Sequence, residues 1–380
     1  MSLSVRRFRA VAALVVAASS AALAVPAVAV ADPGPGHHDP AAVFSFNQIN
    51  MVSDVPGMAP LTDPDAVNPW GLALSPTSPL WVSNAGTSTS TVYGSPAGAT
   101  TATKSSVRVT VPGTPPASLP SGQVANTGQG FVLSNGTKSG TARFIFSTLG
   151  GDIDAWSPQV DSAQGPVEVK ASVPGASYTG LALATATNGD QLYAADFAHG
   201  RIDVFDSAFK QVALKDWQFK DADLPEGYVP FNAQAIDNKV FVTYDKPDPT
   251  TGREGVGSGI GIVDEFTPDG SLVSRIATKG ALNAPWGVAV APASWGSLAG
   301  SLLVGNFGDG RINVFRSTGD GRFEHHASGQ LHDTATGQPV SIPGLWALTP
   351  GTAATGGTDS LWFSAGIDNE AHGLIGVFRP

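Results

Sequence analysis

The chain has 380 residues, of which 42% are hydrophobic and only 14% are charged, and its formal net charge at pH 7 is −10. A charged fraction well below average, together with 45 Gly and 29 Pro, is typical of many short strands joined by turns. The acidic balance argues against binding to nucleic acid or to an anionic membrane. The absence of cysteine excludes disulfides and thiol chemistry.

The first 31 residues have the pattern of a signal peptide. Arg6, Arg7 and Arg9 precede an apolar segment over residues 10–30, and Ala29-Val30-Ala31 supplies small residues at a cleavage position. We therefore expect a secreted protein without a membrane span in its mature chain, which would have a formal charge of −13 once three Arg are removed. A single membrane-spanning anchor is the alternative, and the general and twin-arginine export routes both stay open.

Residues 32–40 are rich in Pro, Gly and His and are expected to form a flexible linker. Residues 41–380 are expected to form a single domain. This domain opens with the apolar run 42–46, Ala-Val-Phe-Ser-Phe, which predicts a lone strand ahead of a series of repeats.

Three kinds of apolar run then recur at intervals of 50 to 59 residues. The first kind, often led by Pro-aromatic-Gly, occurs at 70–74, 130–133, 180–183, 231–235, 286–290 and 345–348. The second kind occurs at 80–84, 144–148, 192–196, 240–244, 302–306 and 361–365. The third kind places an aromatic residue five positions after a Gly, at 151–156, 200–205, 261–266, 310–315 and 373–378, and the first repeat has 91–93 instead.

This organisation predicts an all-β fold, a six-bladed β-propeller. Three strands and a more variable fourth at a period near 55 residues are typical of propeller blades, and no segment shows helical periodicity. The third run of the last repeat ends two residues before Pro380. We therefore expect residues 42–46 to supply the missing fourth strand and to close the ring, since an open blade edge would invite aggregation.

The repeat built from residues 180–183, 191–196 and 200–205 resembles an NHL-type propeller repeat. The segments 68–72, 283–287, 303–310 and 344–348 resemble an uncharacterised family of exported bacterial propeller proteins, and the likeness covers the chain from about residue 44 onward. This resemblance implies the fold and export but no activity. A wider similarity to gluconolactonase-like and lyase propellers implies a divalent metal in the channel, yet residues 68–74 lack the ligating Glu expected in the first blade.

One rim of such a propeller gathers the residues that precede strand one and those that end strand two of each blade. Trp70, Phe231, Tyr244 and Trp286 are therefore candidate ligand-binding residues at the channel mouth. Asn84, Asp196 and Asn306 end strand two in alternate blades, and their oxygens are candidate ligands for a weakly held Ca²⁺. The alternatives are that these Asn and Asp side chains fasten their own turns and that the Trp side chains pack between blades.

No catalytic constellation stands out in the sequence, so no catalytic residue is assigned. We expect a monomeric, exported binding module whose ligand is a small molecule, a glycan or a protein. The alternative is a metal-dependent hydrolase or lyase of the gluconolactonase-like kind, so the sequence leaves enzymatic activity open.

Overall fold

The computed structural model describes residues 42–113 and 119–380, so the predicted signal peptide and linker lie outside the described residues. In this part of the chain almost all regular structure is β-strand, and helix is limited to the 3₁₀ turns η1 (Ala85–Thr87) and η2 (Gly296–Leu298). Among the described residues, no helix is long and apolar enough to cross a membrane.

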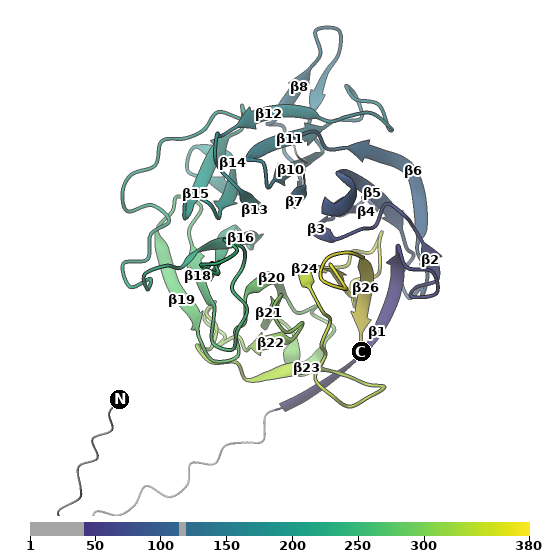
Figure 1. The fold of residues 1–380 in the computed structure, drawn as a ribbon, viewed down its shortest axis with the longest axis vertical. Helices are drawn as coiled ribbons and strands as arrows, with labels where there is room; N and C mark the ends of the chain where they lie inside the picture. The colour runs from purple at the N-terminus through teal and green to yellow at the C-terminus, as the bar shows by residue number, and fades with distance from the viewer. Residues whose placement is uncertain (1–41, 114–118) are drawn as a thin grey trace, which may run out of the picture. The chain divides into compact units, whose positions relative to one another are not determined.

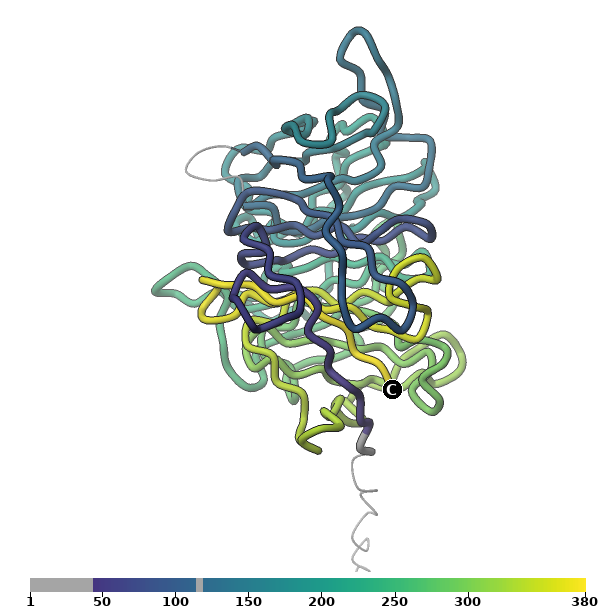
Figure 2. Tube along the Cα trace, turned by 90° about the vertical axis from the view of Figure 1, so that its right-hand side faces the viewer, coloured from purple at the N-terminus to yellow at the C-terminus, as the bar shows by residue number. Residues whose placement is uncertain are grey.

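Four antiparallel meanders form separate sheets. Their strands are β3 (Pro69–Ala73), β4 (Leu80–Asn84), β5 (Thr89–Gly94) and β6 (Thr103–Thr110); β7 (Pro120–Ala125), β10 (Phe144–Thr148), β11 (Asp152–Trp156) and β12 (Glu168–Ser172); β13 (Tyr178–Ala186), β14 (Gly189–Asp196) and β15 (Arg201–Asp206); and β16 (Val229–Ile236), β17 (Lys239–Asp245), β18 (Ile262–Phe266) and β19 (Leu272–Thr278). A hairpin of β8 (Val132–Ser134) and β9 (Ser139–Thr141) projects beyond these sheets in both views (Figures 1 and 2).

The remaining strands form one nine-stranded sheet in the order β20-β21-β22-β23-β1-β26-β25-β24, with β2 paired to β1. Their bounds are β20 (Pro285–Val290), β21 (Leu302–Asn306), β22 (Ile312–Phe315), β23 (Gly329–Asp333), β24 (Leu345–Pro350), β25 (Leu361–Ala365), β26 (Leu374–Arg379), β1 (Ala42–Ser53) and β2 (Leu61–Thr62). Two of the predicted blades are therefore joined into one continuous sheet through β1.

The sheets surround a common axis (Figure 1). Their innermost strands contact one another in the cyclic order β3, β7, β13, β16, β20, β24 and back to β3. Strands such as β4, β11, β18 and β25 are buried along their whole length, because a neighbouring sheet covers each face. The prediction of an all-β propeller is confirmed, and the continuous apolar runs of the sequence have this double burial as their cause.

The N-terminal strand completes the last blade and closes the ring, as predicted, but through other residues than those predicted. Residues 42–46 pair in parallel with β23, and it is the second half of β1, from Asn47 to Ser53, that pairs antiparallel with β26. Figure 2 shows β1 and β26 side by side near the C-terminus. The prediction that residues 42–46 complete the last blade was wrong because β1 is twelve residues long and spans two neighbouring meanders.

A polar contact fixes the far end of this closing strand. Asp54 follows β1, and its carboxylate accepts hydrogen bonds from the Gly373 N–H (2.7 Å) and contacts His372 Nδ1 (2.7 Å) just before β26. The Ser53 hydroxyl donates to the Gly373 carbonyl (2.7 Å). The hydrogen bond that the His372 ring donates to Asp54 is the main cause that raises the pKa of His372 above its ordinary value, and the negative charge of Asp54 is the next.

The stability contributed by His372 is expected to depend on pH. Because the pKa in the folded state exceeds that in the unfolded state, this contribution is complete below the ordinary pKa of 6.5 and is lost as pH rises through the folded-state value. The Tm difference between wild type and His372→Gln should therefore be largest near pH 5.5 and should shrink towards pH 8.5. Thermal melts across this range test the idea, and a difference that stays constant with pH would contradict it.

Candidate functional site

Aromatic side chains close the central channel at one level. Trp346 of β24 stacks on Trp70 of β3, with ring centroids 3.6 Å apart, and on Phe307, at 4.2 Å. The Trp346 ring also makes edge contacts with Phe231 of β16 and Trp286 of β20, with ring centroids 6.0 Å and 5.8 Å apart. Since β16 and β24 are not neighbours among the innermost strands, these rings reach across the axis, and together they form a buried cluster.

A cavity of about 390 Å³ lies against this cluster. Trp70, Phe197 and Phe231 contribute aromatic surface, and the polar lining includes Asn68 and Thr179. Trp70, Thr179 and Phe231 lie near the start of strand one of their sheets, Asn68 precedes β3 and Phe197 follows β14. All five lie at the rim where the sequence analysis expected a binding site.

A chain of polar contacts borders the cavity. Arg253 forms ion pairs with Glu254 (2.8 Å) and with Glu370, which belongs to a different sheet connection. The other oxygen of Glu370 accepts from Asn68 Nδ2 (2.8 Å), and Asn68 Oδ1 accepts from Trp346 Nε1 (3.0 Å). Burial raises the pKa of Glu254 by more than the neighbouring Arg253 lowers it. The contacts join the aromatic cluster to a charged rim.

The indole N–H groups of the cluster differ in their partners. Trp346 Nε1 donates to Asn68, and Trp286 Nε1 donates to the Thr179 carbonyl (2.9 Å). Trp70 Nε1 is buried and has no hydrogen-bond partner among the described residues, although its side chain lines the cavity. The nitrogen itself is buried, so other atoms of the Trp70 side chain form the cavity wall.

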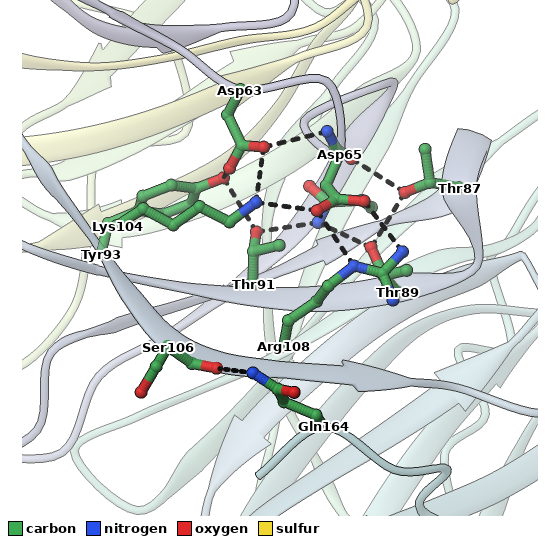
Figure 3. A network of polar contacts seen from close by, with 11 residues as sticks. Asp63, Asp65, Thr87, Thr89, Thr91, Tyr93, Lys104, Ser106, Arg108 and Gln164 are labelled. Carbon is green, nitrogen blue, oxygen red and sulfur yellow. Dashed lines mark hydrogen bonds and ion pairs between the residues drawn. The ribbon is translucent and has the colours of Figure 1, made fainter.

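A second polar network holds the loop that carries Asn68 (Figure 3). The buried Asp63 carboxylate accepts from Tyr93 Oη (2.6 Å) and Lys104 Nζ (2.6 Å), and Asp65 pairs with Lys104 (2.7 Å) and with Arg108 through two hydrogen bonds. Burial acts to raise the pKa of Asp65, but the hydrogen bonds and charges of Arg108 and Lys104 outweigh it and lower the pKa. The network fixes the approach to β3.

The four predicted ligand-binding residues have different surroundings in the structure. Trp70 and Phe231 line the cavity. Trp286 lies in the aromatic cluster and is not among the lining residues. Tyr244 does not reach the mouth, because its ring is buried in another core cluster with Phe266. The prediction was wrong for Tyr244, whose pKa burial raises well above its ordinary value.

The three predicted metal ligands make side-chain hydrogen bonds near their own strands, although Asn84 Oδ1 and Asn306 Oδ1 are buried without a partner among the described residues. Asn84 Nδ2 donates to Thr89 and Thr91, and Asn306 Nδ2 donates to the Ala281 carbonyl and to Asp309. Asp196 accepts from the Ser177 and His199 N–H groups and contacts the His199 ring (2.6 Å). These contacts correspond to the turn-fastening alternative, and calcium binding stays a prediction without support from this placement.

The residues that follow strand two line the mouth instead. Ala85, Leu149 and Phe197 each come directly after the last residue of β4, β10 and β14, and all three line the cavity. Successive side chains of an extended chain point to opposite sides, so the neighbours Asn84 and Asp196 face away from the mouth. Arg253, Glu254 and Glu370 were missed in the sequence because they lie in connections that differ from repeat to repeat.

The fold and this site define a β-propeller with a cavity above an aromatic closure of its channel. No family model matches the sequence. The chain is 33% identical over 341 residues to the uncharacterized protein R648 of Acanthamoeba polyphaga mimivirus, covering 88% of this chain and 80% of R648. It is 32% identical over 347 residues to the uncharacterized protein L690 of the same virus, covering 88% and 86%.

The chain therefore belongs to the family of R648 and L690. These relatives are viral and uncharacterized, so they give no support to the predicted bacterial and exported character of the family. The family assignment carries no activity.

Solved structures show a likeness of fold. An α-L-arabinofuranosidase, Arb93A from Fusarium graminearum, superposes with a TM-score of 0.51 at 13% identity, covering 88% of this chain and 98% of that one. A streptogramin B lyase gives a TM-score of 0.48 at 13% identity over 88% and 97%, and a gluconolactonase from Xanthomonas campestris gives 0.40 at 16% identity over 68% and 85%. At these identities the likeness concerns the fold alone.

Proposed function

We propose that this protein is a binding module that holds a carbohydrate in the cavity at the channel mouth. The observation that carries the proposal is the combination of aromatic surface from Trp70, Phe197 and Phe231 with the charged pair Arg253 and Glu370 in one cavity. A sugar ring offers an apolar face for stacking and hydroxyl groups that donate and accept hydrogen bonds. The proposed site of action is outside the cell, after removal of residues 1–31, as the sequence pattern suggests.

The charged rim suits hydroxyl groups. The Glu370 carboxylate accepts hydrogen bonds and the Arg253 guanidinium donates them, so the pair is able to engage both the donor and the acceptor of a hydroxyl. Both side chains retain exposure, at 16% for Glu370 and 55% for Arg253. A ligand is therefore able to reach them without opening the core.

The dimensions favour more than one sugar unit. A further cavity of about 440 Å³, lined in part by Phe307, Asp309 and Asn369, shares Glu370 with the first. Phe307 is also a member of the aromatic cluster through its stacking on Trp346. The two cavities thus place aromatic surface on either side of one carboxylate, which fits a short oligosaccharide better than a single ring.

The metal-dependent alternative lacks an observation in its favour. Hydrolase chemistry of that kind needs protein ligands that converge on one ion. Within residues 42–113 and 119–380, no group of three or more His, Cys, Asp or Glu side chains has such an arrangement.

Binding is testable with a panel of neutral mono- and oligosaccharides, followed by calorimetry and by tryptophan fluorescence. Glu370→Gln keeps the shape of the side chain but removes its charge, and we expect it to weaken binding of the active saccharide roughly tenfold, the usual effect of losing a hydrogen bond to a charged group.

The matched control is Glu226→Gln, which removes the same charge from an exposed residue that lines neither cavity. Its affinity should equal that of the wild type. The proposal is overturned if no saccharide binds at millimolar concentration or if the Glu370 and Glu226 variants bind equally well.

A further inference from the structure

A further cavity, larger than the two at the channel mouth, lies between the first two meanders. Its volume is about 660 Å³, within the range of sites that hold small organic molecules. Trp81 and Ser105 come from the first meander, and Phe144 and Trp156 come from the second. The cavity therefore sits at the junction of two sheets and shares no lining residue with the cavity at the channel mouth.

This cavity opens on the opposite rim. Its lining includes residues 75–79, which connect the end of β3 to the start of β4, whereas Asn68 of the first site precedes β3. Since β3 runs from one rim of the ring to the other, the two cavities lie at opposite ends of that strand. Occupancy of one does not require the other.

The apolar part of the lining is a set of packed aromatic rings. The Trp81 ring stacks on Phe144, with centroids 4.1 Å apart and an interplanar angle of 16°, and it lies 4.8 Å from the Trp156 ring. All three side chains are buried and belong to one core cluster. Their indole and phenyl edges are held in place by the sheets, so the cavity presents preformed aromatic surface.

The polar part of the lining contains a single charge. Arg143 is the only charged residue that lines the cavity. Its backbone is held on both sides, because its N–H donates to the Trp156 carbonyl (2.8 Å) and its carbonyl accepts from the Asn126 N–H (2.9 Å). The backbone of Arg143 is thus fixed beside the aromatic surface.

Arg143 differs from most arginines of the described chain. Arg108, Arg201 and Arg275 each pair with a carboxylate. No carboxylate of the described residues lies within ion-pair distance of Arg143, and none lines the cavity. In a chain with a formal charge of −10, a guanidinium without an acid at an aromatic cavity points to an acidic ligand.

Three other polar residues of the lining already have hydrogen-bond partners. The Asn126 side chain donates to the Ala142 carbonyl (2.9 Å) and accepts from the Gly128 N–H (2.9 Å). The Ser105 hydroxyl accepts from the Val107 N–H (3.1 Å), and Trp156 Nε1 donates to the Ser162 carbonyl (3.1 Å). The guanidinium is therefore the charged group that is able to fix the orientation of a ligand.

We propose that this cavity binds a small aromatic carboxylate, with its ring against Trp81, Phe144 and Trp156 and its carboxylate paired with Arg143. A guanidinium matches the two oxygens of a carboxylate in a fork. One positive charge balances one carboxylate, whereas a phosphate dianion would remain half uncompensated among apolar groups. The aromatic faces favour a flat ring over an aliphatic chain of the same size.

The test uses the purified protein and three probes of similar size. These are 2-naphthoate, its neutral amide 2-naphthamide and the saturated two-ring acid decahydronaphthalene-2-carboxylate, with affinities measured by calorimetry and ligand-observed NMR. We expect 2-naphthoate to bind at least roughly tenfold more tightly than either comparison probe. Absence of 2-naphthoate binding, or equal affinity for the acid and the amide, would overturn the proposal.

Two variants locate the binding. Arg143→Gln should reduce the affinity for 2-naphthoate to that of the amide, and Arg143→Lys, which keeps the charge but loses the fork, should give an intermediate value. Arg322→Gln is the matched control, because this side chain is 75% exposed and distant in sequence from the cavity. Wild-type affinity in the Arg143→Gln protein, or an equal loss in the Arg322→Gln protein, would refute the assignment of the site.

Discussion

Removal of residues 1–53 is expected to abolish the soluble folded protein, whereas removal of residues 1–41 is expected to leave its thermal stability unchanged. The longer truncation deletes β1, which pairs with β26 through Asn47–Ser53 and with β23 through Ala42–Phe46. Both partner strands would then expose unpaired backbone groups at the join of the nine-stranded sheet. Open edges of this kind lead to aggregation.

A truncation through Phe46 separates the two contributions. It removes the parallel pairing with β23 but keeps the antiparallel pairing with β26. We therefore expect an intermediate protein that remains soluble and melts at a lower temperature. Soluble yield, size-exclusion chromatography and thermal melts followed by circular dichroism distinguish the three truncations. Equal stability of the proteins starting at residues 42 and 54 would show that β1 does not close the ring.

Trp346→Ala is expected to produce the largest destabilisation of any single substitution in the channel. Trp346 is fully buried and stacks on both Trp70 and Phe307. Its loss removes aromatic contacts and leaves a cavity on the axis, which typically costs about 3–5 kcal/mol. For a chain of this size the corresponding fall in Tm is roughly 5–10 °C. The substitution also leaves Asn68 Oδ1 without the indole donor.

Two comparisons make this result specific. Trp346→Phe keeps part of the stacking, so its effect should be smaller, and Trp217→Ala should be close to neutral because Trp217 is 50% exposed. Chemical denaturation gives the free energies of unfolding. A Trp346→Ala protein as stable as the Trp217→Ala protein would mean that the aromatic closure is not part of the core.

The repeats of the sequence predict the fold well because each strand is defined locally. Runs such as residues 80–84 and 302–306 are uniformly apolar, and the structure forms β4 and β21 over these bounds. The pairing of the closing strand β1 was harder to predict. Its register depends on two partners, β23 and β26, that lie about 280 residues or more away in the sequence.

The side-chain directions at the site could not be predicted, for one physical reason. Asn84, Tyr244 and Asn306 lie opposite Pro69, Pro230 and Pro285, so they occupy equivalent positions in their sheets. The sequence identifies this position but not the direction of its side chains. A shift of one residue reverses that direction, and the side chains that face the mouth include the neighbours Ala85 and Phe197.

The charged rim was beyond prediction for another reason. Arg253 and Glu370 are 117 positions apart and lie in connections without a repeated pattern. Only closure of the ring brings them together. The aromatic residues Trp70 and Phe231, in contrast, follow a Pro that recurs at the start of strand one, and both line the cavity.

The pairing of β1 with β26 also sets the order in which the ring is able to assemble. The N-terminal strand is synthesised first, yet the partner of Asn47 is Arg379, the penultimate residue of the chain. During synthesis β1 must therefore wait without this partner while the intervening sheets form. Contacts at such sequence separation cost loop-closure entropy and slow folding. A chain interrupted before residue 374 retains an unpaired β1 edge, so the ring closes only after residues 374–379 have been synthesised.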